Sequence, residues 1–305
     1  MQPDAVAAVR FDAIEKRYGD RKVVDGISLD IAQGEFFALL GANGAGKTTL
    51  ISMLSGLTRP TGGRVCVLGR DVAVDPVGVR RLLGVVPQEL VFDPFFSVRE
   101  ALRLQSGYFG LRHNDDWIDE LLHNLGLEPQ AEQNMRALSG GMKRRVMVAQ
   151  ALVHKPPVIV LDEPTAGVDV ELRQSLWQFI TRLNRQGHTV LLTTHYLEEA
   201  QALCNRIAMV KLGRLVALDT THALLARFAS TQLQFRLLAG RLPDALAHRC
   251  KPVGARLGCA IREPADVESV LEALRLGGCV IDELEVRRAD LEDAFLQVMH
   301  QEAVA

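Results

Sequence analysis

The segment GANGAGKT, residues 41–48, constrains this chain more than any other stretch. It matches the pattern G-x-x-x-x-G-K-[ST], follows the apolar run EFFALL and opens a segment with helical spacing, which is the context that this pattern requires. Glycines let backbone N–H groups turn toward phosphate oxygens, and a helix N-terminus adds partial positive charge. We expect Lys47 to reach the β and γ phosphates of a nucleotide and Thr48 to offer its hydroxyl to Mg²⁺. The predicted phosphate-binding residues are Gly41, Ala42, Asn43, Gly44, Ala45, Gly46, Lys47, Thr48 and Thr49.

Length and charge exclude several other classes of protein. The 305 residues, 48% of them hydrophobic, are enough for one large domain with a smaller one. Lys and Arg number 35 against 37 Asp and Glu, so no overall positive field attracts a nucleic acid. No apolar run approaches the roughly 20 residues that span a bilayer. Asp4 and the lack of a basic flank also argue against a secretory signal.

The cysteines indicate a reducing environment. They are odd in number, widely scattered and without a C-x-x-C pair, which is typical of neither a disulfide scaffold nor a zinc site. A reducing cytosol suits such thiols. The five cysteines are Cys66, Cys204, Cys250, Cys259 and Cys279.

The hydrophobic pattern predicts an α/β core. Residues 6–33 alternate apolar and polar positions between turn signals, which indicates a group of antiparallel strands. Short unbroken apolar runs follow, as expected for strands buried on both faces of a parallel sheet. These runs are EFFALL, LLGVVP, PVIVLDEP and TVLLTTH. Amphipathic stretches lie between them at 48–57, 142–154 and 171–186, and this alternation is typical of α/β proteins.

Two further regions differ from this core. Residues from about 89 to 137 form a largely helical insert, with helices expected at 97–109 and 115–125. Residues 221–305 combine strand-like and helical stretches, and we expect a small α+β appendage there. Its final stretch LEDAFLQVMH places Leu291, Phe295 and Val298 on one apolar helix face.

Asp162 and Glu163 end the apolar run VIVLDEP, where two adjacent carboxylates are costly without a partner. A bound metal ion and a water molecule would be such partners for the two carboxylates. Asp162 can hold hydrated Mg²⁺, and Glu163 is placed to orient and polarise an attacking water, a role worth roughly 10²- to 10⁴-fold in rate. The alternative is an acidic pair that caps a helix on a loop, but the preceding apolar run disfavours a surface loop.

Three single residues carry weaker signals. His195 ends the run TVLLTTH, so we place it at the carboxyl edge of the sheet, where ligands of open α/β sheets bind. A lone histidine is more often structural, but this position favours function. Gln88 follows GVVP and either ligates Mg²⁺ or finishes a turn. Tyr18 either stacks on adenine or packs beneath the strand group.

Ser139, Gly140 and Gly141 precede a second helical stretch, MKRRVMVAQAL, and form another helix N-terminus that can bind an anion. One nucleotide does not easily occupy both sites within a subunit. Two copies arranged head to tail can each clamp the other's nucleotide, and Ser139 then supplies charge stabilisation from the neighbouring chain, as an arginine finger does elsewhere. The alternative is an ordinary capped helix.

In this order and approximate spacing, the motifs resemble those of ABC ATPases. After the phosphate-binding loop come LSGGM at 138–142, VLDE at 160–163, AGVD at 166–169 and then His195. The resemblance covers residues 6 to about 220. LSGGMKRR, AGVDVELR and THYLEEA are most similar to the ATP-binding subunits of bacterial two-component exporters for drugs, polysaccharides and nodulation factors, and the appendage with its LEDAFL is similar to that group too.

The resemblance implies an α/β fold of the P-loop NTPase class. Residues 1–220 would form an ABC ATPase domain with an antiparallel β subdomain and a helical insert, and 221–305 a C-terminal α+β accessory domain. It implies ATP and Mg²⁺ as ligands, and a homodimer that closes around two Mg-ATP. It also implies a separate transmembrane permease that contacts the cargo, no nucleic acid, and a peripheral place on the cytoplasmic face of the inner membrane.

The resemblance also assigns residue roles. Tyr18 would stack on adenine, and Asp169 would make a contact across the dimer. Gln88 would link Mg²⁺ and the attacking water to the membrane partner. The predicted catalytic residues are Glu163, His195 and Gln88, and the predicted Mg²⁺ ligands are Thr48, Gln88 and Asp162.

Two positions depart from the family pattern. Met142 replaces the glutamine that is common in the signature, but the hydroxyl and backbone N–H groups of 139–141 do the phosphate work, so we expect activity to survive. AGVD replaces the commoner serine-alanine-leucine-aspartate loop; it keeps Asp169 and leaves the cross-dimer hydrogen bonds open.

Two groups of side chains in or after the insert remain ambiguous. Five aromatic residues either form a groove for a membrane subunit's cytoplasmic helix or pack as the core of the insert. Lys143, Arg144 and Arg145 are expected to form a solvated helix face, with an interdomain role as the alternative. The five aromatic residues are Phe92, Phe95, Phe96, Tyr108 and Phe109.

Two rival functions remain. A soluble ABC-type ATPase could act on nucleic acid or ribosomes, but this chain has one motif set and no sustained heptad pattern. A P-loop GTPase or small-molecule kinase would leave the signature unexplained, and no N-K-x-D guanine-reading sequence occurs.

Overall fold

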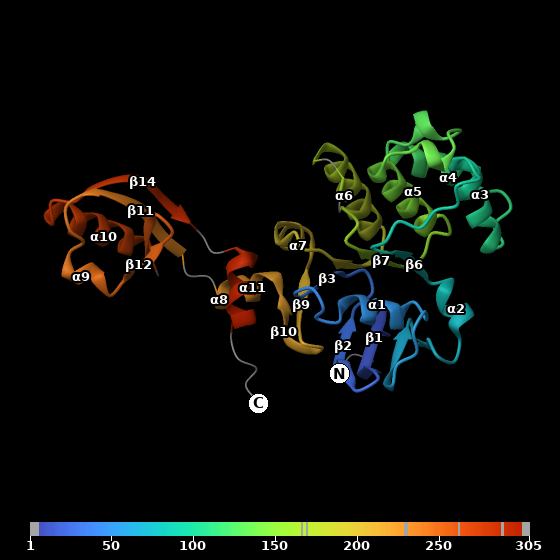
Figure 1. Cartoon of the computed structure of the whole chain (residues 1–305), viewed down its shortest axis with the longest axis horizontal. Helices are drawn as coiled ribbons and strands as arrows, with labels where there is room; N and C mark the ends of the chain where they lie inside the picture. Colours follow the sequence, from blue (N-terminus) through green and yellow to red (C-terminus); the bar gives the residue numbers. More distant parts are fainter. Residues whose placement is uncertain are drawn as a thin grey trace. The chain divides into compact units, whose positions relative to one another are not determined.

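The computed structural model describes residues 6–165, 167–168, 170–228, 231–261, 263–287 and 290–300 (Figure 1). The chain divides into two compact units, residues 1–220 and 221–305. Each unit has its own sheets and its own helices.

A six-stranded sheet forms the centre of the first unit, with the strand order β10-β9-β3-β8-β7-β6. Its strands are β3 (Phe36–Leu40), β6 (Leu83–Val86), β7 (Val158–Asp162), β8 (Thr189–Thr193), β9 (Arg206–Lys211) and β10 (Arg214–Thr220). Five of them run parallel, and β10 pairs antiparallel with β9 at one edge. Every residue of β3, β7 and β8 is buried, which explains why these strands are unbroken apolar runs in the sequence.

The first unit also contains a four-stranded antiparallel sheet with the order β2-β1-β4-β5. Its strands are β1 (Val9–Tyr18), β2 (Arg21–Ile31), β4 (Gly62–Val67) and β5 (Arg70–Asp71). Helix α1 (Lys47–Leu54) buries Leu50 and Met53. The same hydrophobic core contains Ile14 of β1, Leu50 of α1 and Leu191 of β8, so the two sheets and α1 share one core. The antiparallel strand group expected from residues 6–33 is confirmed.

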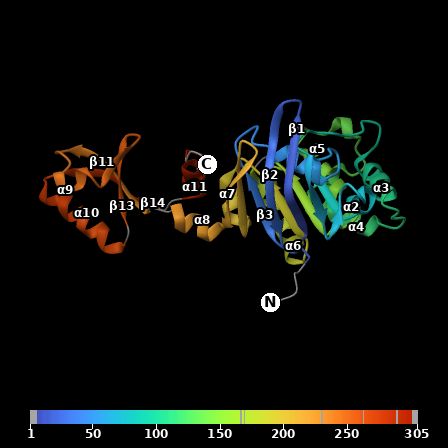
Figure 2. The same cartoon turned by 90° about the horizontal axis from the view of Figure 1, so that it is seen from below.

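The helical insert contains the two helices predicted from the sequence. Figures 1 and 2 both show α3, α4 and α5 gathered together, and these helices contact one another. Ser97 and Glu100 form a reciprocal capping box that starts α3, and Trp117 donates from Nε1 to the Leu152 carbonyl (3.0 Å), which fastens α4 to α5. The helical elements between β5 and β7 are α2 (Pro76–Arg80), α3 (Val98–Tyr108), α4 (Asp115–Asn124), η1 (Glu128–Gln130), η2 (Met135–Ala137) and α5 (Gly140–Leu152).

Helices α6 (Val170–Arg185) and α7 (Leu197–Leu203) complete the first unit. Leu176, Ile180 and Leu183 recur at helical spacing along α6 and are buried. Trp177 of α6 donates from Nε1 to the buried Glu199 carboxylate of α7 (3.0 Å), so a polar bond also joins the two helices.

The second unit contains a β-α-β-β-α-β module, a recurring split arrangement. Its elements are β11 (Thr231–Ala239), α9 (Asp244–Ala247), β12 (Cys250–Val253), β13 (Arg256–Ile261), α10 (Pro264–Leu276) and β14 (Val280–Arg287). The sheet order is β12-β13-β11-β14, and Figure 2 shows α9 and α10 on one face of this sheet. Phe235 of β11 and Val270 of α10 are fully buried between them. Helices α8 (Thr221–Phe228) and α11 (Leu291–His300) contact each other, and α11 buries Leu291 and Val298.

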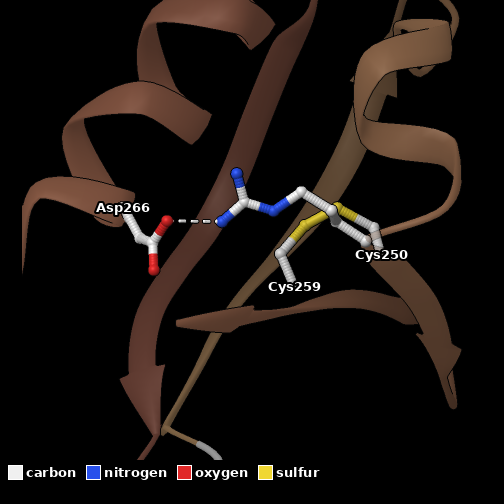
Figure 3. The surroundings of a disulfide bond; sticks show 4 residues. Cys250, Cys259 and Asp266 are labelled. Atoms are coloured by element: carbon white, nitrogen blue, oxygen red, sulfur yellow. Dashed lines mark hydrogen bonds and ion pairs between the residues drawn. A yellow bond between two sulfur atoms is a disulfide. The ribbon is translucent and has the colours of Figure 1, made fainter. Parts of the chain in front are cut away.

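The cysteine prediction is wrong for one pair. Cys250 of β12 and Cys259 of β13 form a disulfide, drawn in Figure 3. These two residues are direct partners in the antiparallel register, so their side chains project from the same face of neighbouring strands. Beside them, Arg249 donates to Asp266 of α10 (2.6 Å). Counting and spacing cysteines could not find this pair, because only the register of the hairpin brings them together.

Candidate active site

The glycine-rich segment forms a tight loop between β3, which ends at Leu40, and α1, which begins at Lys47. A Cβ atom on Gly41 would lie 2.4 Å from the Val210 carbonyl oxygen, so only glycine fits beside β9. Gly46 is the residue before α1 and has φ 106°, a conformation that residues with a Cβ rarely adopt. The loop therefore passes tightly from β3 to the N-terminus of α1, where a helix can bind phosphate.

Lys47 is nearly buried at the start of α1, with 9% of its surface exposed. Its Nζ donates to the carbonyl oxygens of Gly41 (2.7 Å) and Ala42 (3.3 Å), so the ammonium group lies within the loop. Burial lowers the pKa of Lys47, and the nearby carboxylates Glu163 and Asp162 oppose that shift. The loop therefore holds a cation at the place where phosphate oxygens would bind.

Asp162 is the last residue of β7 and only 3% exposed. Its carboxylate accepts hydrogen bonds from the hydroxyls of Thr193 and Thr48. Burial raises the pKa of Asp162, because a desolvated carboxylate disfavours its charge. A nearby cation would relieve that cost, so the strand end is suited to a metal ligand.

Glu163 follows Asp162 and turns the backbone sharply, with φ 50°. Its N–H donates to the Thr193 carbonyl (3.0 Å), and its side chain is 15% exposed. Gln88 donates from Nε2 to Glu163 Oε2 (3.2 Å), and His195 Nδ1 lies 3.5 Å from the same oxygen. The structure thus brings the three predicted catalytic residues together at the carboxyl ends of β6, β7 and β8.

The donors around this point fit Mg²⁺. Thr48 offers a hydroxyl, Asp162 a carboxylate and Gln88 an amide oxygen, all of them hard oxygen ligands. Within the described residues no group of three or more His, Cys, Asp or Glu side chains could cage a metal. Mg²⁺ does not need such a cage, since it usually takes one or two carboxylates together with phosphate oxygens and waters. Bound here, it would neutralise charge on the phosphates.

The second predicted anion site lies at the start of α5. Ser139 is the N-cap of this helix, and its Oγ accepts from the Met142 backbone N–H (3.3 Å). The bond involves the main chain of Met142, so it does not depend on the side chain at that position. Ser139 and Gly140 are exposed, and the first-turn N–H groups of a helix have no partner within the helix.

The loop after Glu163 lies close to this helix start. A Cβ atom on Gly141 would be 3.5 Å from the Gly167 carbonyl oxygen. Asp169, predicted to make a contact across a dimer, lies outside the described residues.

Tyr18 is the last residue of β1 and is half exposed. Lys16 Nζ lies 4.8 Å above the centre of its ring. The exposed ring does not pack beneath the strand group, so that alternative is wrong. A flat aromatic surface remains open for a stacking partner.

The expected solvated face at 143–145 is wrong for two of its three residues. Arg144 and Arg145 are 6% and 5% exposed. Arg144 donates to the carbonyl oxygens of Pro87 and Gln88, and Arg145 to those of Leu125 and Gly126. Sequence reasoning missed both, although a signal was present: the following residues, VMVAQAL, leave α5 little polar face on which arginines could be solvated.

Thr193 was also missed. It is fully buried in β8, and its hydroxyl donates to Asp162 while its carbonyl holds the Glu163 N–H. Within TVLLTTH nothing separates this threonine from an ordinary strand residue, because its role depends on the pairing of β7 with β8.

Comparison with known proteins identifies the family. The family described as ABC transporter matches residues 24–166. The Nod factor export ATP-binding protein I of Burkholderia thailandensis is 38% identical and aligns over 98% of this chain and 99% of its own length. This chain belongs to the ABC transporter family. The Nod factor export ATP-binding protein I of Rhizobium sp. (strain N33) is 37% identical to this ABC protein, over 97% of this chain and 98% of its own.

Solved structures agree with the family. An ATP-binding subunit of an ABC transporter covers 72% of this chain and 93% of its own length, with a TM-score of 0.69 and 28% identity. A dimeric ATP-binding cassette in a post-hydrolysis state, bound to ADP and Pi, covers 70% and 98%, with a TM-score of 0.64 and 26% identity. The protein is therefore an ATP-hydrolysing ABC subunit of the exporter type, and the α/β P-loop fold predicted from the sequence is confirmed.

Proposed function

We propose that this ABC ATPase is the motor subunit of an export complex, in which two copies close around two Mg-ATP molecules and drive separate membrane subunits. Residues 1–220 are the nucleotide-binding domain of this motor, and 221–305 form an accessory domain. In the described part of the chain no helix is long and apolar enough to cross a membrane. We assign the movement of cargo to a separate permease and place the motor on the cytoplasmic face of the inner membrane, because the relatives are named as export ATP-binding proteins.

The observation that carries the proposal is the convergence of Gln88, Glu163 and His195 beside the phosphate-binding loop. Glu163 accepts a proton from the attacking water, while Gln88 and His195 at its Oε2 hold that carboxylate in place. Lys47 and the loop N–H groups bind the β and γ phosphates, and Tyr18 stacks on adenine. Thr48, Asp162 and Gln88 would hold Mg²⁺, which would neutralise charge on the phosphates.

Dimerisation completes this site. Ser139, Gly140 and Gly141 form a helix start on the surface of the subunit, where a γ-phosphate bound to a second copy can reach it. The match to a dimeric cassette with ADP and Pi supports this arrangement. Asp169 would add a contact across the same interface.

A hollow beside Gln88 is suited to the membrane partner. It has a volume of about 190 Å³ and is lined by Val85, Pro87, Val91, Phe109 and Met147, among others. Phe95 and Tyr108 of the same insert are 77% and 81% exposed. None of the five insert aromatics is fully buried, which disfavours their packing as a core. We assign this surface to a short cytoplasmic helix of the permease.

The export role rests on the relatives, whose names describe Nod factor export. The cargo would be chosen by the permease. A soluble ABC ATPase acting on nucleic acid or ribosomes has less support, since the net charge is −2 and the relatives named here are export proteins. Co-purification of a membrane protein from solubilised membranes would separate the two functions.

The Glu163→Gln variant tests the motor itself. We expect ATP turnover to fall by roughly 10²-fold or more, because the amide cannot accept the water's proton. ATP binding should persist, so the variant should accumulate as a dimer with Mg-ATP in size-exclusion chromatography with light scattering. Glu198→Gln, an exposed residue at the start of α7, is the matched control and should keep wild-type turnover. A Glu163→Gln protein that stays monomeric with Mg-ATP contradicts the clamp.

A further inference from the structure

Two adjacent arginines of α5 make matching bonds to different parts of the first unit. Arg144 donates from Nη1 to the Pro87 carbonyl (2.6 Å) and from Nη2 to the Gln88 carbonyl (2.5 Å). Arg145 donates from Nη1 to the carbonyls of Leu125 (2.6 Å) and Gly126 (2.9 Å). Both side chains are almost completely buried. One arginine thus holds the segment after β6, and the other holds the end of α4.

The segment held by Arg144 leads directly to the reaction centre. Gln88 is fixed by its main chain to Arg144 and by its side chain to Glu163 Oε2. Two successive hydrogen bonds therefore join Arg144 of α5 to the general base Glu163 by way of Gln88. The hydrogen bonds of Arg145 to Leu125 and Gly126 hold the end of α4 instead.

The environment of Arg144 is costly for a purely structural bond. Carbonyl oxygens are neutral, so they do not compensate the buried guanidinium charge. Its Nε has no hydrogen-bond partner among the residues that the structure describes. Burial lowers the pKa of Arg144, while the charges of Glu163 and Asp162 oppose that shift, so the guanidinium is electrostatically coupled to the acidic pair.

We propose that Arg144 is a positioning residue that makes the Gln88 segment and α5 move together, so that each catalytic centre reports its state to the signature on the same chain. Ser139, the N-cap of α5, and Arg144 are separated by about 1.4 turns of this helix. A shift of Gln88 on nucleotide binding is transmitted through Arg144 to Ser139, which serves the other ATP. The communication between sites rests on the proposed dimer, whereas the positioning of Gln88 does not.

A double-mutant cycle with the full-length protein tests the positioning role. Arg144→Lys keeps the charge but cannot bridge two carbonyls in a fixed fork. We expect kcat for ATP to fall at least fivefold with a smaller change in KM, because Lys47 and the phosphate-binding loop are untouched. On a Gln88→Ala background the same change should have almost no further effect, since Arg144 acts through Gln88. Arg145→Lys, equally buried, should lower thermal stability and remain additive with Gln88→Ala.

The cycle separates this inference from the proposed function. Additive effects of Arg144→Lys and Gln88→Ala, or an identical loss of kcat in Arg145→Lys, would overturn the positioning role. The Hill coefficient for ATP tests the communication: it should exceed 1 in the wild type and approach 1 in Arg144→Lys. A wild-type Hill coefficient of 1 at every protein concentration refutes the communication between sites, while the cycle still decides whether Arg144 positions Gln88.

Discussion

At the scale of single residues, the site depends on backbone positions as much as on side chains. Glu163 has φ 50°, and a non-glycine residue in this region costs on the order of 1–3 kcal/mol unless its surroundings hold it. Thr193 provides that hold by accepting the Glu163 N–H. The strained turn separates two neighbouring carboxylates, so that Asp162 stays buried while Glu163 faces Gln88 and His195.

His154 makes the stability of the first unit sensitive to acid. Its Nε2 lies 3.1 Å from the Leu83 carbonyl, its ring stacks on Phe109, and burial lowers its pKa from 6.5 to about 4. The unfolded chain takes up a proton near pH 6.5, whereas the folded chain does so only near pH 4. The free energy of unfolding is therefore highest above pH 6.5 and falls between pH 6.5 and 4.

His154→Gln removes this titration. Urea denaturation at pH 7.5 and 5 should show a smaller acid-induced loss for the variant than for the wild type. His113→Gln, at an exposed position, is the control and should follow the wild type. Equal losses for His154→Gln and the wild type would show that His154 is not the titrating group.

At the scale of elements, long periodic segments were predictable and short paired ones were not. The runs that became β3, β7 and β8 are continuous because both faces are covered, and α3 lies within the helix expected at 97–109. Strands β12 and β13 carry only four and six residues, with Pro252 in the first. Such strands have no pattern of their own, since register and partner define them.

Thiol counting tests the β12–β13 hairpin. The protein denatured without reductant should expose three thiols, those of Cys66, Cys204 and Cys279, and five after reduction. Cys250→Ser should expose four without reductant, because Cys259 loses its partner. Five thiols in the unreduced wild type, prepared under oxidising conditions, would mean that the hairpin register seen here does not bring the two sulfurs together. Ellman's reagent gives the count.

At the scale of the whole molecule, the sequence predicted the family and where several of the candidate site residues lie. Motif order and strand ends placed Lys47, Asp162 and Glu163 correctly, because parallel strands all deliver their carboxyl ends to one edge. The hydrogen bond from Arg144 to the Gln88 carbonyl could not be predicted from the sequence, because it joins α5 to a residue 56 positions away. The cross-dimer role that the sequence predicts for Ser139 involves a second copy, so the geometry of one chain does not test it.

Mixing two inactive proteins tests the assembly. Lys47→Ala disables nucleotide binding, and Ser139→Arg blocks the signature with a bulky side chain. In a mixed dimer, the phosphate-binding loop of the Ser139→Arg chain faces the intact signature of the Lys47→Ala chain. One of the two composite sites is therefore whole. An equimolar mixture should regain at most about a quarter of wild-type turnover if pairing is random and the sites share residues in trans. Each protein alone is the control, and no recovery in mixtures that demonstrably form hetero-dimers would argue against sharing.

The contact between Gly41 and the Val210 carbonyl has one more consequence. There is no space for even a methyl group between the phosphate-binding loop and β9. Variation at Gly41 cannot adjust nucleotide affinity in small increments, because the smallest added group would already displace β9. Engineering of affinity in this subunit has to begin elsewhere, at exposed positions such as Asn43 or Tyr18.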